Sequence, residues 1–262
     1  MRRLGVGYRQ ALANWIASKP PQINCLEITA EHFFNDTKKL KTLQRDYDLF
    51  VHGLGLSLGT PGPLDQSYLN RFVDICLTAQ PLWISEHIAF TRSAEVDLGH
   101  LTPFPYTANA LANFVDHAQQ VKEACQKPLL LENITSHINI ASPLSETKFI
   151  NQLCEKAGCY LLLDVTNLWV NSRNHHYDAV DWLHEIQPEF IKQLHIVGYT
   201  ERNGLFYDSH ANNIQPALYT LTREVIKYSQ VDSIIIERDN NFPPLSQITD
   251  ELAALEHCFE TH

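Results

Sequence analysis

Short apolar runs recur along the chain and are separated by longer stretches of mixed polarity. Eight such runs, rich in leucine or β-branched residues, occupy residues 4–8, 23–29, 48–52, 82–87, 129–133, 160–165, 191–197 and 233–237. Within each run the apolar residues are nearly continuous, which is typical of parallel strands buried on both faces. We therefore predict one strand in each run.

The stretches between these runs carry helical periodicity. In residues 108–124, apolar side chains from Leu111 to Val121 follow the i, i+3, i+4 spacing of a helix with one buried face. Residues 145–156 show a similar stripe, and Ser145 is placed to cap that helix. Strands that alternate with helices predict a parallel α/β sheet, and a count of eight predicts closure into a (β/α)8 TIM barrel.

The length of 262 residues suits one such barrel, and no linker rich in Pro, Gly or Ser divides the chain, so we expect a single domain over residues 1–262. The formal net charge of −10 disfavours a nucleic-acid partner, which would require a basic face. No apolar run is long enough to span a membrane. The six cysteines form no CxxC pair and indicate buried thiols in a reducing compartment, so we expect a cytoplasmic protein.

The chain contains thirteen histidines but only one methionine, and several of the histidines lie where a predicted strand ends. The polar residues at or near the ends of runs two to eight are Glu27, His52, Glu86, His87, Glu132, Asn133, Asp164, His195 and Glu237. In a parallel barrel these ends share one face, where the active site is built. Carboxylates packed together repel, and cations remove that penalty. Mixed imidazole and carboxylate ligands suit iron, zinc or manganese better than calcium.

Each of these residues alone has an ordinary structural explanation. A single histidine at a strand end is usually a hydrogen-bonded partner, and a single aspartate there can cap the next helix. Seven consecutive strand ends carry ligand-type side chains, and this regularity favours a metal site over seven unrelated structural roles. Asp208 and His210, in the predicted long loop after the seventh strand, can reach one ion together. Asn167 is close enough to Asp164 to join it, and Trp169 is close enough to line the pocket.

Longer phrases carry a resemblance to a known family. They are VHGLGLSLGT (51–60), SEHIAFTR (85–92), LTPFPYTANAL (101–111), LLLENITSHI (129–138), LLLDVTNLWVNSRNHHYD (161–178), YDSHANNI (207–214) and IIIERDNNFP (234–243). In this order they resemble the multinuclear non-haem iron-dependent oxidative enzymes, a family that includes the iron enzyme of methanobactin biosynthesis. The likeness runs from Gly5 to about Glu251.

The resemblance implies a xylose-isomerase-like TIM barrel with two or three iron ions in a mixed-valence Fe2+/Fe3+ state. Dioxygen would be the co-substrate, and the substrate would be a cysteine of a ribosomally synthesised precursor peptide. We also expect a partner protein that recognises the leader segment, because a mouth crowded with metal leaves little surface for it.

The family motifs also imply roles for individual residues. Glu132 resembles a bridging ligand that shares one iron with His52 and His87. A second iron would be held by Asp164, His195 and Glu237, and a third by Asn167, Asp208 and His210. The catalytic roles fall to His87, Glu132 and Asp164. Substrate-lining positions would be Glu27, Glu31, Asn133, Trp169 and Tyr199.

Three departures from the family pattern leave the peptide and the product open. Many members have two asparagines after the strand-six aspartate, where this chain has Thr166 and Asn167. Many have His-x-x-Gly-His after strand seven, where this chain ends the motif with Tyr199. Many have Glu-Asn near the second strand, where this chain has Glu31 followed by His32.

Two other classes of function are consistent with the same residues. The order of ligands also resembles trinuclear zinc endonucleases of the endonuclease-four type and dinuclear sugar isomerases, in which zinc would be the metal. The acidic charge disfavours the nuclease, as does Asn167 where that family has a histidine. The third class is a non-catalytic subunit or metal-bound scaffold, which the complete ligand set disfavours.

Overall fold

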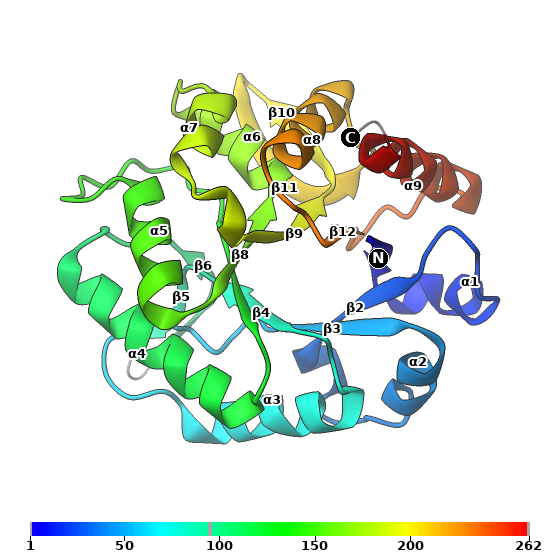
Figure 1. The fold of residues 1–262 in the computed structure, drawn as a ribbon, viewed down its shortest axis with the longest axis horizontal. Coiled ribbons are helices and arrows are strands. Elements are labelled where there is room, and N and C mark those ends of the chain that lie inside the picture. The colour runs from blue at the N-terminus through cyan, green and yellow to red at the C-terminus, as the bar shows by residue number, and fades with distance from the viewer. Residues whose placement is uncertain (1, 94–95, 261–262) are drawn as a thin grey trace.

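Eight parallel strands close into a barrel in the computed structural model, which describes residues 2–93 and 96–260 (Figure 1). The strands are β1 (Arg3–Gly7), β2 (Cys25–Thr29), β3 (Asp48–His52), β4 (Ile84–His87), β7 (Leu129–Glu132), β8 (Tyr160–Asp164), β9 (Ile191–Ile196) and β12 (Ser233–Ile236). Their order around the barrel is β1-β12-β9-β8-β7-β4-β3-β2, and β1 closes it by pairing with both β12 and β2. Each predicted run coincides with one of these strands, so the predicted (β/α)8 barrel is confirmed.

Helices surround the ring of strands (Figure 1). They are α1 (Ala13–Ala17), α2 (Leu40–Asp46), α3 (Gln66–Ala79), α4 (Ala108–Cys125), α5 (Glu146–Ala157), α6 (Val165–Asn174), α7 (Ala179–Glu185), α8 (Pro216–Tyr228) and α9 (Leu245–Glu260). Short 3-10 helices occupy Gln10–Leu12, Ala30–Phe33 and Pro188–Phe190. The two helices predicted from periodicity correspond to α4 and α5. Ser145 caps α5 as expected, because its hydroxyl accepts a hydrogen bond from the backbone N–H of Lys148 at 3.3 Å.

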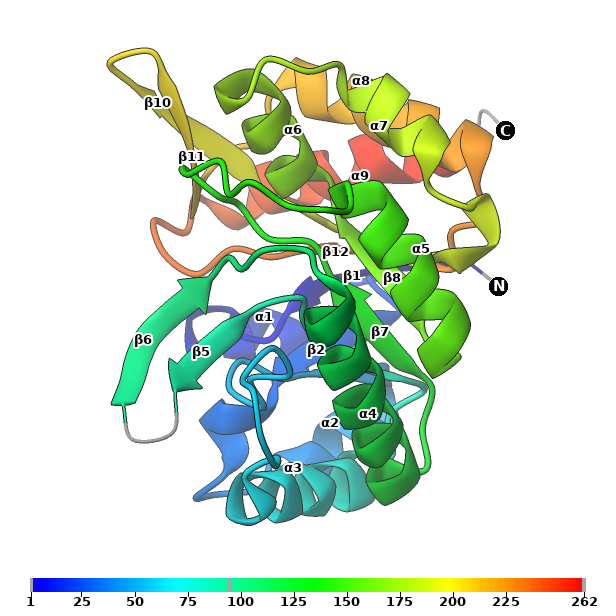
Figure 2. The ribbon, with the colours of Figure 1, turned by 90° about the vertical axis from the view of Figure 1, so that its left-hand side faces the viewer.

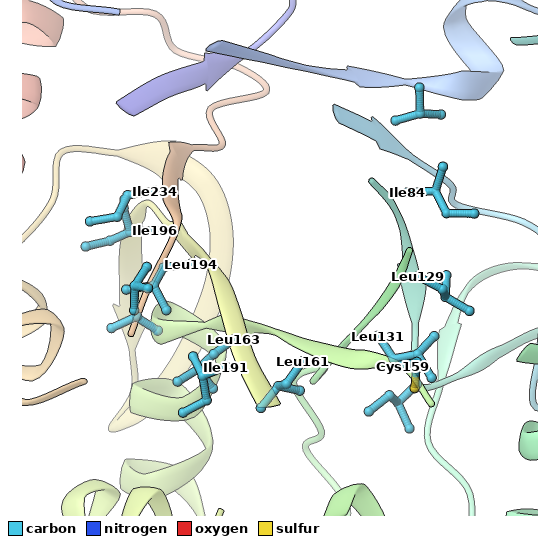
Figure 3. Packing of buried hydrophobic residues seen from close by; sticks show 14 of the residues in the cluster. Ile84, Leu129, Leu131, Cys159, Leu161, Leu163, Ile191, Leu194, Ile196 and Ile234 are labelled. Carbon is cyan, nitrogen blue, oxygen red and sulfur yellow. The ribbon is translucent and has the colours of Figure 1, made fainter. Parts of the chain in front are cut away.

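The outer face of the strands packs against the helices. Leu129, Leu131, Leu161 and Leu163 lie on this face (Figure 3) and belong to the same buried cluster as Phe149 of α5. The apolar runs are continuous because the inner face of the barrel is buried as well.

The inner face carries an apolar layer with a polar layer above it. The apolar layer consists of Cys25, Phe50, Trp83, Leu130, Leu162 and Ile235, and the rings of Phe50 and Trp83 stack with centroids 4.2 Å apart. Side chains alternate along a strand, so the residue two positions later points to the same side. Above this layer the inner face therefore presents Glu27, His52, Glu132, Asp164 and Glu237.

Two antiparallel hairpins extend from the end of the barrel at which the strands finish (Figure 2). One consists of β5 (Phe90–Ser93) and β6 (Val96–Thr102), and the other of β10 (Gly198–Arg202) and β11 (Leu205–Asn212). The sequence predicted a long loop after the seventh barrel strand, and this prediction was wrong. The segment pairs with itself through the register Tyr199↔Asp208.

The cysteines match the expectation of buried thiols. All six are buried, and none forms a disulfide within the described residues. No helix within residues 2–93 and 96–260 combines the length and apolarity that a membrane crossing would require.

Candidate metal centre

The polar layer at the barrel mouth gathers into overlapping groups of ligand-type side chains. In each group, one ligand atom from every residue lies within 4.8 Å of the others. The groups are His52, His87 and Glu132; Glu132, Asp164, His195 and Glu237; and Asp164, Asp208 and His210. A further group of His210, Glu237 and Asp239 extends toward solvent.

The first group joins the ends of β3, β4 and β7. The Nε2 atoms of His52 and His87 lie 3.5 and 3.6 Å from Oε2 of Glu132. The opposite nitrogen of each imidazole is engaged elsewhere: Nδ1 of His52 meets the Ser85 hydroxyl at 2.8 Å, and Nδ1 of His87 meets Oε1 of Glu86 at 3.0 Å. Both Nε2 atoms therefore face Glu132, so β3 and β4 each direct one imidazole toward the same carboxylate.

The second group lies deeper and is almost fully buried. Nδ1 of His195 is 3.2 Å from Oε1 of Glu132 and 3.0 Å from Oε2 of Glu237. Asp164, from the neighbouring strand, completes the group, and its exposed fraction is 0%. Nε2 of His195 lies 2.7 Å from Oε1 of Glu27, on the side away from the group.

The third group combines Asp164 with two side chains of β11. Nε2 of His210 lies 2.6 Å from Oδ2 of Asp208. His210 has a φ of +48°, a left-handed conformation that costs a histidine energy and that clusters at functional sites. Its Nδ1 is 3.1 Å from Oδ2 of Asp239, which fixes the orientation of the ring.

Five buried polar atoms of the predicted metal ligands have no hydrogen-bond partner in the described part of the chain. They are His52 Nε2, Glu132 Oε2, Asp164 Oδ2, Asn167 Oδ1 and Asp208 Oδ1. Each atom has a lone pair that can bind a metal ion. Burying such an atom without a hydrogen-bond partner costs desolvation free energy. Cations placed between these atoms would remove the penalty for all of them, so the residues fit a multinuclear metal site.

The charges of the cluster favour the same conclusion. Burial holds the pKa of His52 well below its usual value, so its imidazole is neutral and able to ligate. Burial also lowers the pKa of His210, but Glu237 and Asp208 outweigh this effect and raise it to about 12. Burial and the nearby Asp208 raise the pKa of Asp164 well above its usual value. Protons therefore compensate part of the carboxylate charge when no cation does.

Every imidazole in the groups has its second nitrogen held by a defined partner. These partners are the Ser85 hydroxyl and the carboxylates of Glu86, Glu27 and Asp239. Histidines that bind metals usually donate their other N–H in this way, which fixes the tautomer and the ring orientation.

Two residues expected to line a substrate pocket, Glu27 and Asn133, are buried and hydrogen-bonded inside the protein. Glu27 is 3% exposed, and its carboxylate contacts His195 and the side chain of Gln193 inside the barrel. The Asn133 side chain pairs with the backbone of Asp164: its Nδ2 donates to the carbonyl at 3.1 Å and its Oδ1 accepts from the N–H at 2.9 Å. Glu27 therefore orients the His195 ring, and Asn133 links β7 to β8.

Asp164 caps a helix, one of the two roles considered for it, and keeps one carboxylate oxygen outside the cap. Its Oδ1 accepts the backbone N–H of Asn167 at 2.7 Å and caps α6, while its Oδ2 is one of the unpaired atoms. The cap holds Asn167 in place, and Nδ2 of Asn167 donates to the Asn133 carbonyl at 3.0 Å. Oδ1 of Asn167 is left facing no partner, next to the third group.

Three expected substrate-lining residues lie half-buried at the mouth. The rings of Trp169 and Tyr199 stack with centroids 6.4 Å apart, and Nε1 of Trp169 is buried without a partner. Oε1 of Glu31 accepts from the Leu54 N–H at 2.8 Å and from the Tyr68 hydroxyl, while its Oε2 has no partner. Each side of the mouth thus retains a polar atom that is available to a ligand.

Sequence reasoning missed Arg9 and Asp239. The Arg9 guanidinium lies 2.6 Å from Asp239 and 3.6 Å from Glu237, so it balances carboxylate charge at the rim. The signal was available: Arg9 follows the end of the first strand, and Asp239 lies two residues beyond a predicted ligand.

A closed parallel barrel with clustered imidazoles and carboxylates at its strand ends defines a TIM-barrel enzyme with a candidate multinuclear metal centre. The family model described as RiPP precursor modification enzyme MbnB/TglH/ChrH matches residues 3–260. RiPP denotes a ribosomally synthesised and post-translationally modified peptide. The chain belongs to this family, which confirms the resemblance inferred from its motifs.

Individual relatives also match nearly the whole length of the chain. The chain is 33% identical to a UPF0276 protein of Shewanella sediminis, with 95% of this chain and 92% of that protein covered. It is 32% identical to a UPF0276 protein of Shewanella oneidensis, with 98% and 94% covered.

Solved structures share the fold at low identity. An L-ribulose 3-epimerase superposes with a TM-score of 0.68 at 13% identity and covers 100% of this chain and 95% of its own. Endonuclease IV of Thermus thermophilus gives a TM-score of 0.62 at 11% identity, with 99% and 100% covered. At these identities the likeness concerns the xylose-isomerase-like barrel alone.

Proposed function

We propose that this chain is a cytoplasmic enzyme that binds two or three iron ions at the barrel mouth and uses dioxygen to modify a cysteine of a ribosomally synthesised precursor peptide. The observation that carries the proposal is a set of five buried lone-pair atoms without a hydrogen-bond partner among the described residues, four of them in the overlapping ligand groups and the fifth on Asn167. Membership of the peptide-modifying family supports the substrate class.

The overlap of the groups supports more than one ion. Glu132 belongs to two groups and offers Oε2 to one and Oε1 to the other. Asp164 is likewise shared between the second and third groups. A shared carboxylate suits a bridge between adjacent cations, since each oxygen can serve a different ion.

The donors support a metal that accepts nitrogen and oxygen together. The groups contain imidazoles and carboxylates but no thiolate, a combination that suits iron, zinc or manganese. When bound, iron would supply redox chemistry toward dioxygen and would lower the pKa of a substrate thiol. The chain has no glycine-rich dinucleotide fingerprint, which supports assigning the redox role to the metal.

The protein's own residues would orient the ligands and the peptide. Glu27 and Glu86 would hold the rings of His195 and His87 in the ligating direction. The stacked rings of Trp169 and Tyr199 would shield one side of the mouth from water. On the other side, Oε2 of Glu31 could accept a peptide N–H.

A partner protein would hold the leader segment. Large apolar side chains are exposed on segments that follow strand ends: Leu54 is 39% exposed, Val96 55%, Ile138 61% and Leu205 46%. Their position around the mouth supports a contact surface for a peptide or a partner, whereas a lone exposed residue would carry no such meaning.

The alternative is a zinc-dependent phosphodiesterase, endonuclease or sugar isomerase. The same donor set suits zinc, and proteins with those names share the barrel. The net charge of −10 and the several carboxylates at the mouth disfavour a phosphodiester substrate.

Metal analysis and peptide mass analysis test the proposal together. Protein expressed in iron-rich medium and purified anaerobically should contain iron. Co-expression with a candidate precursor and partner from the same operon should give an oxygen-dependent mass change on the precursor cysteine, abolished by His87→Ala or Asp164→Ala. The matched control is a precursor whose cysteine is replaced by serine. Equal modification of that precursor, or modification without oxygen, would refute the proposal, and colourless zinc protein active on abasic DNA would support the alternative.

A further inference from the structure

A cavity of about 390 Å³ is lined in part by residues that follow β4 and β7 at the mouth of the barrel. It lies between the end of the β5–β6 hairpin and the segment 133–145 that joins β7 to α5. Its apolar lining includes Ile88, Phe104, Ile134, Ile140 and Leu144. Ile88 directly follows His87, and Ile134 lies two residues after Glu132, so the cavity shares a wall with the first ligand group.

Side-chain hydrogen bonds hold the wall of this cavity in place. Nδ2 of Asn171 donates to the Ile134 carbonyl at 2.8 Å, and Oδ1 of Asn171 accepts the Ser136 N–H at 2.9 Å. Nε2 of His175 donates to the Ser136 carbonyl at 2.6 Å. The segment is therefore fixed by α6, and the cavity does not require a ligand to form.

Glu146, at the start of α5, forms the polar end of the cavity. Its Oε2 accepts from Nε1 of Trp182 at 2.9 Å, and its Oε1 accepts from the Tyr106 hydroxyl at 3.2 Å. No lysine or arginine of the described ranges forms an ion pair with it, and burial raises its pKa. The Tyr177 hydroxyl also lines the cavity and is buried without a hydrogen-bond partner.

Acidic side chains are numerous around this end, and His175 is the one histidine among the residues that line the cavity. A second cavity, which Glu146 also lines, has Asp178, Asp181 and Glu185 in its wall. A ligand that reaches Glu146 meets the apolar side chains of Ile88, Ile134 and Leu144, then a carboxyl group that pairs with no lysine or arginine of the described ranges, and the Tyr177 hydroxyl. An aliphatic chain that ends in a cation complements all three features.

We propose that this cavity is a specificity subsite for a lysine side chain of the peptide substrate. The lysine methylenes would lie along Ile88, Ile134 and Leu144, and the ammonium would donate to Glu146 and to the Tyr177 oxygen. This inference rests on the proposed peptide-modifying function. Because Ile88 directly follows His87 and Ile134 lies two residues after Glu132, the subsite would select a residue close to the modified cysteine.

Binding of two small probes tests the subsite. N-acetyl-lysine N-methylamide and N-acetyl-norleucine N-methylamide have the same aliphatic stem, but only the first carries a charge. By calorimetry, with the site located by NMR shifts of residues around the cavity, the lysine probe should bind at least about tenfold more tightly, as expected for hydrogen bonds to a charged group. Glu146→Gln should abolish this preference, while Glu155→Gln, an exposed position on the same helix, should preserve it.

A second variant keeps the test decisive if Glu146→Gln does not fold. Tyr177→Phe should weaken binding of the lysine probe about tenfold, the effect of losing one hydrogen bond to a charged group, and leave the norleucine probe unchanged. Equal affinity for the two probes, no saturable binding at the cavity, or a lysine preference that survives Glu146→Gln would overturn the proposal. Neither iron nor oxygen is needed for this binding, so its failure is distinct from failure of the proposed reaction.

Discussion

Replacing Glu132 by glutamine should remove more metal than any other single ligand substitution. Glu132 faces His52 and His87 through Oε2 and His195 through Oε1, so it belongs to two ligand groups. Glutamine preserves the volume of the side chain but loses the charge and one of the two oxygen donors. Two ions should therefore be weakened together, whereas His52→Gln should weaken only one.

The size of the effect on stability follows from binding linkage. A ligand present at about 100 times its Kd stabilises the folded state by ~2.7 kcal/mol for each site. Loss of two sites should then cost ~5 kcal/mol and loss of one ~2.7 kcal/mol. For a chain of this size, each kcal/mol shifts Tm by about 2–4 °C. The metal-dependent gain in Tm should fall by about 10–20 °C in Glu132→Gln and by about 5–10 °C in His52→Gln.

The amount of bound metal can be measured by mass spectrometry. The metal-dependent gain in Tm can be measured on the same samples by thermal unfolding with and without added iron. Glu155→Gln, an exposed acid on α5, is the matched control and should resemble the unmodified protein in both. The assignment of Glu132 as a shared ligand is refuted if Glu132→Gln retains full metal, or if His52→Gln loses more metal than Glu132→Gln does.

Three further outcomes are expected. Mild chelation should first remove the ion expected at Asp208 and His210, because these residues lie on a half-buried hairpin outside the barrel. The circular dichroism spectrum should stay unchanged, and loss of all metal together with unfolding would contradict this prediction. Glu27→Gln should weaken metal binding about 10–100-fold, the usual effect of losing a partner that orients a ligating histidine, and titration with iron or zinc measures it. Burial lowers the pKa of His87, but Glu132 and neighbouring carboxylates raise it to about 9. Because this folded pKa lies above the unfolded value, the metal-free protein should lose stability as pH rises from about 6.5 to 9, and denaturant titrations that show a gain instead would contradict it.

The barrel and most of the candidate ligands could be predicted because the relevant signals are local. A strand buried on both faces requires a continuous apolar run, and the side chain that ends such a run must lie at the mouth of a parallel barrel. For this reason His52, Glu132 and Asp164 could be placed at one end of the molecule before their distances were known. The same reasoning could not separate ligands from their neighbours. Glu27 also lies near a strand end, yet its carboxylate contacts His195, which is itself a candidate ligand.

The hairpins escaped prediction because their signal is weak. A two-stranded sheet in contact with solvent has few buried positions, so β10 and β11 show no apolar run. Asp208 and His210 were correctly singled out as a pair, but the strand that holds them was not foreseen.

Contacts between distant segments were decided by tertiary structure alone. Arg9 meets Asp239 only because the first and last strands pair and close the ring. Glu146 becomes the end of a cavity only because Tyr106, Tyr177 and Trp182 arrive from three other segments. The sequence determined by itself the period of burial along each strand, and therefore the fold and the chemical types at its mouth. Closure of the barrel determined which of those groups lie close enough to hold one ion together and which contact another side chain, because these contacts depend on distances between strands that no local pattern encodes.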